Sequence, residues 1–126
     1  MKTESIINQH LAHGQWLKTI DFYRDEIKIM RARLEEVASK NTHQEVTVQI
    51  ERFQNQLIIQ TSTLDQLSHD IRKHEQEIAS MVIENPVASD HRRAAVTPEH
   101  EEGMITFEKM FNDLRHEFIR FLAKVM

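Results

Sequence analysis

Apolar side chains recur in alternating steps of three and four residues along three segments of the chain, 6–37, 46–81 and 104–125. This heptad spacing gathers them on one face of an α-helix, whereas a strand would alternate apolar and polar residues with a period of two. We call these apolar faces the first, second and third seams. Together they predict an all-α protein with three long helices.

Local signals mark where the helices begin and end. Thr42 and Glu45 have the three-residue spacing of a capping box, so the second helix is expected to begin there. Asn85 precedes a proline, which disfavours helical backbone and ends this helix. Thr97 and Pro98 form a cap and first-turn pair for the third helix. The predicted helices span about 4–39, 43–85 and 98–126.

These helices predict an up-down-up antiparallel bundle, in which residues 1–126 form a single domain and residues 86–97 form the inter-helix loop. In an alternative interpretation the second helix breaks near Thr61 and a fourth helix begins. Thr61 and Thr63 are weak helix formers, and Thr63 with Gln66 has the spacing of another helix cap. The second seam keeps its phase through this stretch, however, which favours one continuous helix.

A short turn at 38–41 predicts how the helices lie side by side. In a hairpin with that turn, residues whose numbers sum to about 80 are neighbours, and His13 and His74 would lie about 10 Å apart along the axis. The third helix, running antiparallel to the second, would place Phe121 near Leu64. The half of the hairpin next to the turn would then expose its seams, because no third helix covers it.

The outer faces of the first two helices carry apolar residues where a solvated helix would carry charge. No charged residue occurs between Phe53 and Leu64. Concentrated apolar residues on an outer face indicate an interaction surface, so we expect a homodimer that completes a larger bundle, an elongated monomer being the alternative. The expected oligomer-interface residues are Phe22, Ile29, Val48, Ile58 and Ile59.

Four polar side chains occupy positions within the first and second seams. Single polar residues in helical cores fix register and partner choice, and this is the role we expect for them. The alternative is a polar-lined pocket near His13 and His74 that holds a small ligand or a metal. The four polar core residues are Gln9, His13, Gln60 and His74.

The spacing of the eight histidines argues against a metal site. Metal ligands on one helix face recur as His-x-x-x-Glu, His-x-x-x-His or Glu-x-x-His, and the nearest such pair, Asp113 with His116, has no second copy. His100 begins a zincin-like His-Glu pair that lacks the second histidine. With His13 and His74 about 10 Å apart in the predicted register, we expect no metal and no cofactor.

Composition argues against several other function classes. The formal charge of −4 disfavours a nucleic-acid surface, which is normally basic. Without cysteine the chain forms no disulfide, zinc ribbon or thiol nucleophile. The sequence shows no signal peptide and no apolar run near the ~20 residues of a membrane span. The expected compartment is the cytoplasm, with no contact to a membrane.

The chain also lacks the glycine-based motifs of common enzymes. With two glycines it contains no phosphate loop, dinucleotide fingerprint or nucleophile elbow, and we identify no catalytic residue. The expected function is that of a non-catalytic oligomeric interaction or scaffold module rather than an enzyme. The alternative function is that of a helical bundle that binds a small ligand or a metal near His13 and His74.

Overall fold

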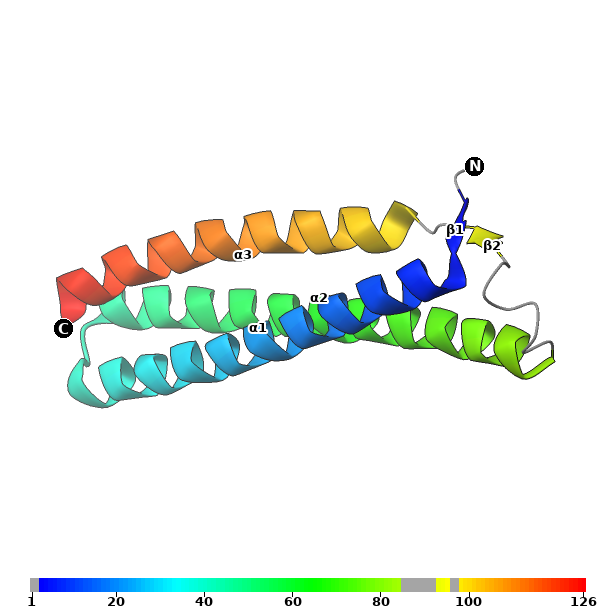
Figure 1. The fold of residues 1–126 in the computed structure, drawn as a ribbon. Helices are drawn as coiled ribbons and strands as arrows, with labels where there is room; N and C mark the ends of the chain where they lie inside the picture. The colour runs from blue at the N-terminus through cyan, green and yellow to red at the C-terminus, as the bar shows by residue number, and fades with distance from the viewer. Residues whose placement is uncertain (1–2, 85–92, 96–97) are drawn as a thin grey trace.

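The computed structural model describes residues 3–84, 93–95 and 98–126. Three helices account for most of these residues: α1 (Ile6–Lys40), α2 (Gln44–Glu84) and α3 (Pro98–Val125). Helices α1 and α2 form an antiparallel hairpin, and α3 runs beside it antiparallel to α2 (Figure 1). The predicted all-α, up-down-up bundle of three helices is confirmed. None of the helices in the described ranges is long and apolar enough to cross a membrane.

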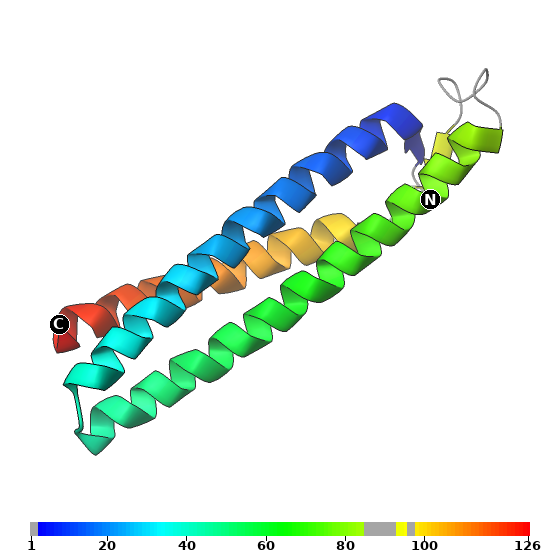
Figure 2. The same ribbon diagram turned by 90° about the horizontal axis from the view of Figure 1, so that it is seen from below.

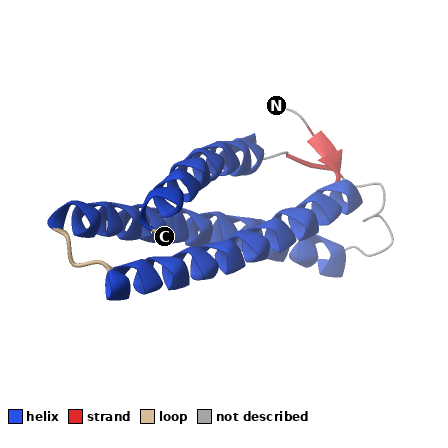
Figure 3. Ribbon diagram, turned by 90° about the vertical axis from the view of Figure 1, so that its left-hand side faces the viewer, coloured by secondary structure: helices blue, strands red, loops and turns tan. Residues whose placement is uncertain are grey.

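Two three-residue strands lie at the end of the bundle opposite the hairpin turn (Figures 1 and 3). Strand β1 (Thr3–Ser5) pairs with β2 (Arg93–Ala95) in antiparallel register. The first helix begins at Ile6, two residues after the predicted start at about residue 4, because β1 precedes it. Strand β2 interrupts the expected loop 86–97, the rest of which lies outside the described residues. Three residues are too few to show an alternation of apolar and polar side chains in the sequence. Main-chain hydrogen bonds hold such short strands together.

The turn between α1 and α2 lies at 41–43 rather than at the predicted 38–41. The side-chain amide of Asn41 donates a hydrogen bond to a carbonyl one turn earlier (2.9 Å), so it satisfies one of the free carbonyls at the end of α1. At the start of α2, the first carbonyl to accept a helical hydrogen bond is that of His43. The capping position is therefore His43 and not the predicted Thr42.

Helix α2 is continuous over Gln44–Glu84. The hydroxyl of Thr61 donates to the carbonyl of Leu57 (2.9 Å), and the hydroxyl of Thr63 donates to the carbonyl of Ile59 (3.1 Å). Both bonds run back along the helix, so these weak helix formers satisfy their polar groups without interrupting it. The prediction of one continuous second helix is confirmed.

Ion pairs between α1 and α2 give the register of the hairpin. Arg24 Nη1 lies 2.6 Å from Asp65 Oδ1, and His13 Nδ1 lies 2.5 Å from Glu75 Oε1. The residue numbers of these two pairs sum to 89 and 88. The predicted sum of about 80 is therefore wrong by about one heptad. A shift of seven residues leaves the seams facing each other, so the periodicity does not distinguish the two registers.

Helix α3 packs along most of the hairpin, from the turn to the level of His13 and His74, as two views and the ring contacts of His100 show (Figures 1 and 2). The ring of Phe53 contacts those of Phe118 and Phe121, with centroids 5.4 and 5.1 Å apart. Phe121 therefore lies beside Phe53 and not beside Leu64 as predicted. Helix α3 begins beside His74, well before the end of α2. The seam pattern does not predict at which level of α2 helix α3 begins.

The seam that was expected to be uncovered is buried within a single chain. Leu34 is completely buried, and Ile27, Met30, Ile50 and Phe53 expose at most 5% of their surface. Each such side chain stabilises the fold by about 1.5–3 kcal/mol. The expectation that this half of the hairpin lacks cover is wrong, because α3 extends over it as far as the turn (Figure 1).

Candidate metal centre

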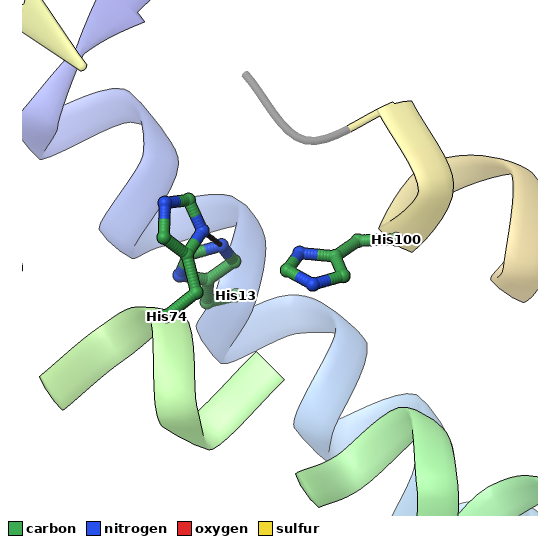
Figure 4. A group of neighbouring side chains, drawn as sticks. All are labelled: His13, His74 and His100. Atoms are coloured by element: carbon green, nitrogen blue, oxygen red, sulfur yellow. Dashed lines mark hydrogen bonds between the residues drawn. The ribbon is translucent and has the colours of Figure 1, made fainter. Parts of the chain in front are cut away.

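Three histidines, one from each helix, converge inside the bundle. His13 belongs to α1, His74 to α2 and His100 to α3. Each offers one ring nitrogen, and the three nitrogens lie within 4.8 Å of one another. Figure 4 shows the three rings close together, with that of His100 reaching in from the start of α3. We call this group the histidine centre.

Helical periodicity aims all three side chains inward. His13 occupies a position of the first seam and His74 one of the second. His100 stands four residues before Met104, where the third seam would place its next member. His13 and His100 are buried, with 2% and 8% of their surface exposed, and His74 is half-buried. The imidazoles are therefore held by the packing of the bundle.

His13 and His74 are in direct contact. Nε2 of His13 and Nδ1 of His74 form a hydrogen bond of 3.2 Å (Figure 4). The predicted separation of about 10 Å is wrong, because the observed register brings the two rings about one heptad closer. Two imidazoles bound to one tetrahedral zinc ion at about 2.0–2.1 Å have nitrogens about 3.3 Å apart. The pair thus has the spacing of two ligands of a single ion.

A glycine allows α3 to bring His100 close to α2. Gly103 lies three residues after His100, on the same side of α3, and a Cβ at this position would lie 2.6 Å from Cδ2 of Leu67 in α2. The missing side chain permits this close approach of the two helices. As a result, the ring centroid of His100 lies 5.9 Å from that of His13 and 5.5 Å from that of His74.

A carboxylate borders the histidine centre on the far side of the His13 ring. Oε1 of Glu75 accepts a hydrogen bond from Nδ1 of His13 (2.5 Å), and Oε2 accepts one from Nδ1 of His10 (2.7 Å). Burial alone would raise the pKa of Glu75, but the hydrogen bonds from His10 and His13 outweigh it and lower that pKa. The carboxylate is therefore ionised at neutral pH.

The surroundings also keep His74 uncharged at neutral pH. Burial and, second, the neighbouring His13 lower the pKa of His74, and the charges of Glu77 and Glu75 offset only part of this effect. A neutral imidazole has the free lone pair that a metal ion needs, whereas an imidazolium has none. His74 is therefore in the protonation state that binds a metal.

The predicted polar core residues lie in different places. Gln9, His13 and Gln60 expose at most 4% of their surface, and His74 is half-buried. His13 and His74 meet in the histidine centre. Gln60 instead lines open grooves between α2 and α3, beside residues such as Met110. Two of the four residues therefore belong to one candidate site, and Gln60 does not.

His100 is the member of the centre that its sequence context conceals. His100 and Glu101 match the start of a zincin motif, but the second histidine that the motif requires is absent. Continuing the third seam one step back from Met104 would have identified it as a core residue. Spacing rules for ligands that share one helix face do not detect a site with one ligand from each of three helices.

The predicted interface residues lie outside the histidine centre, on the outer faces of α1 and α2. Each exposes more than half of its surface, as their helical positions indicate. Their role in self-association stays a prediction. The residues are Phe22, Ile29, Val48, Ile58 and Ile59.

Comparisons with protein-family models, curated proteins and solved structures gave no match to this chain. No residue role is therefore carried over from a relative. The function is inferred from the geometry of the histidine centre.

Proposed function

We propose that the protein is a metal-binding helical bundle. It holds one transition-metal ion, for which we propose zinc, at His13, His74 and His100. The observation that carries this proposal is the convergence of three ring nitrogens within 4.8 Å in the interior of the bundle. The three imidazoles come from three different helices, so the fold as a whole brings them together.

The donor set favours a transition metal over magnesium or calcium. Imidazole nitrogen suits zinc, copper, iron and nickel, whereas magnesium and calcium prefer oxygen ligands. The chain has no cysteine, so thiolate ligation is absent. Zinc accepts three protein ligands with an external fourth in a tetrahedral arrangement. The 3.2 Å spacing of the His13 and His74 nitrogens fits that arrangement.

Binding requires a small movement at the start of α3. The ring nitrogens of the centre lie up to 4.8 Å apart, whereas ligands of one zinc ion are about 3.3 Å apart. A shift of about 1–2 Å by His100 closes this gap. Because the ion then joins three helices, zinc should stabilise the folded state by RT ln(1 + [L]/Kd).

Isothermal titration calorimetry tests the proposal on protein that is prepared without an affinity tag and stripped with a chelator. We expect the wild type to bind one zinc ion per chain. His74→Ala and His100→Ala should each weaken zinc binding by more than about 100-fold. Removing the hydrogen-bond partner of a metal ligand weakens affinity about 10–100-fold, and removing the ligand itself should cost more. The matched controls are His69→Ala in α2 and His116→Ala in α3, which replace exposed histidines of the same helices and should bind like the wild type.

Two results would overturn the proposal. One is a wild-type protein that binds no zinc at neutral pH. The other is equal weakening by His100→Ala and His116→Ala, which would assign binding to surface histidines.

We propose self-association as a second function, on a separate observation. Phe22, Ile29 and Ile58 are more than half exposed on outer faces where a solvated helix would carry charge. The hairpin seam no longer supports a dimer, because α3 buries it within one chain. The outer faces of α1 and α2 do support one, and light scattering tests it.

A further inference from the structure

We propose that Glu75 is a positioning residue of the histidine centre, and that its carboxylate holds His13 in the tautomer whose Nε2 faces the metal. The inference rests on the proposed function, since the tautomer of His13 has this use only if an ion binds. It concerns a hydrogen bond that is present without an ion, so part of it can be tested on the metal-free protein.

The hydrogen-bond geometry assigns the proton of the His13 ring. An ionised carboxylate only accepts, so the 2.5 Å contact between Oε1 of Glu75 and Nδ1 of His13 places the proton on Nδ1. In a neutral imidazole the other nitrogen, Nε2, then carries the lone pair. In the metal-free protein that nitrogen accepts a hydrogen bond from Nδ1 of His74 at 3.2 Å. Glu75 therefore points the metal-binding atom of His13 towards the centre.

Glu75 is itself held from two sides. Its Oε2 accepts a hydrogen bond from Nδ1 of His10 at 2.7 Å, and its side chain is 23% exposed. His10 and His13 are one turn apart on α1, so they share the face that meets α2. A carboxylate engaged through both oxygens keeps its orientation towards His13. The same turn of α2 thus supplies one ligand, His74, and the group that orients another.

The negative charge of Glu75 also makes His13 a better ligand. A carboxylate that accepts from the second ring nitrogen fixes the ring orientation and raises the basicity of the ligating nitrogen. Loss of such a partner weakens metal affinity about 10–100-fold. The charge further offsets part of the positive charge of a divalent ion. We therefore expect Glu75 to act on affinity without touching the metal.

Nitrogen-15 NMR of the metal-free protein, labelled at histidine, tests the tautomer. At about pH 8 the wild-type His13 ring should carry its proton on Nδ1, where the hydrogen bond to Glu75 places it. Glu75→Ala should abolish this preference, whereas Glu75→Gln should preserve it, because the amide oxygen still accepts the hydrogen bond. The matched control is Glu51→Ala, which makes the same charge change at an exposed position of α2 far from the histidine centre and should leave the tautomer unchanged.

Zinc titration of the same proteins tests the effect on binding. Glu75→Ala should weaken the zinc affinity about 10–100-fold, and Glu51→Ala should change it less than about twofold. Glu75→Gln should lie between wild type and Glu75→Ala, because it keeps the hydrogen bond and loses the charge. Circular dichroism checks that each variant is helical. If Glu75→Ala does not fold, the zinc affinity of Glu75→Gln and the tautomer of His13 in the wild type test the role of Glu75.

The outcomes separate this inference from the proposed function. A wild-type His13 ring that is protonated at Nε2, or on both nitrogens, overturns the role of Glu75. Wild-type zinc affinity in folded Glu75→Ala overturns it as well and leaves the metal site standing. A wild-type protein that binds no zinc refutes the proposed function itself.

Discussion

Nε2 of His13 lies 3.2 Å from Nδ1 of His74, although 61 residues separate them in the chain. Helices α1 and α2 are antiparallel, so this contact depends on the register of the hairpin. A shift of one heptad would keep the two seams facing each other but would separate the rings by about 10 Å. The histidine centre therefore follows from the observed register, with its turn at 41–43, and not from the periodicity alone.

Acid is expected to destabilise the protein in the pH range where histidine titrates. Burial, and then the nearby His13, lower the pKa of His74, so the folded state binds this proton less readily than the unfolded state. The resulting stability is present above the usual histidine pKa of about 6.5 and is lost as the pH falls through the lower folded value. Urea midpoints at about pH 7.5, 6.5 and 5.5 should fall in that order, and His74→Leu should reduce the fall. An equal fall in wild type and His74→Leu would contradict this.

The two glycines should respond differently to alanine. Nothing lies within 4 Å of a Cβ at Gly14, so Gly14→Ala should raise the free energy of unfolding by about 0.5–1 kcal/mol. Gly103→Ala should not give this gain, because its Cβ would lie 2.6 Å from Cδ2 of Leu67 and either that side chain or α3 must move. Movement of α3 would also weaken zinc binding through His100. Urea denaturation measures both effects on stability, and equal stabilisation by both variants would rule out the close approach of α3 to α2.

Light scattering should report a homodimer, with about twice the 14.9 kDa mass of one chain. Ile59→Glu should shift the protein towards monomer, because it places a charge in the proposed contact. Asn112→Glu, at an exposed position of α3 outside the proposed contact, is the matched control and should leave the dimer intact. A wild type that stays monomeric at high concentration would show that the outer faces of α1 and α2 do not mediate self-association.

The number and direction of the helices could be predicted, because each seam is long enough for its period to be read. The register could not, since the seams fit equally well after a shift of seven residues. The ion pair of Arg24 with Asp65 reports the register, but it lies outside the seams and no periodicity identifies it in advance. The contact of Phe121 with Phe53 depends on the level of α2 at which α3 begins. The seams do not determine that level.

The candidate site could be predicted only in part. His13 and His74 stand out in the sequence because they are polar residues within apolar seams. His100 lies one step before the predicted third seam, which begins at Met104, so its buried position was not predicted. The contact of Glu75 with His13 depends on the hairpin register and could not be found before the register was known.

Anomalous diffraction at the zinc absorption edge, from crystals of the zinc-loaded protein, is the most direct test of the metal centre. We predict one strong peak within about 2.0–2.2 Å of a ring nitrogen of each of His13, His74 and His100. The absence of a peak there, or a peak bound only to exposed histidines such as His69 and His116, would contradict the proposed metal-binding function.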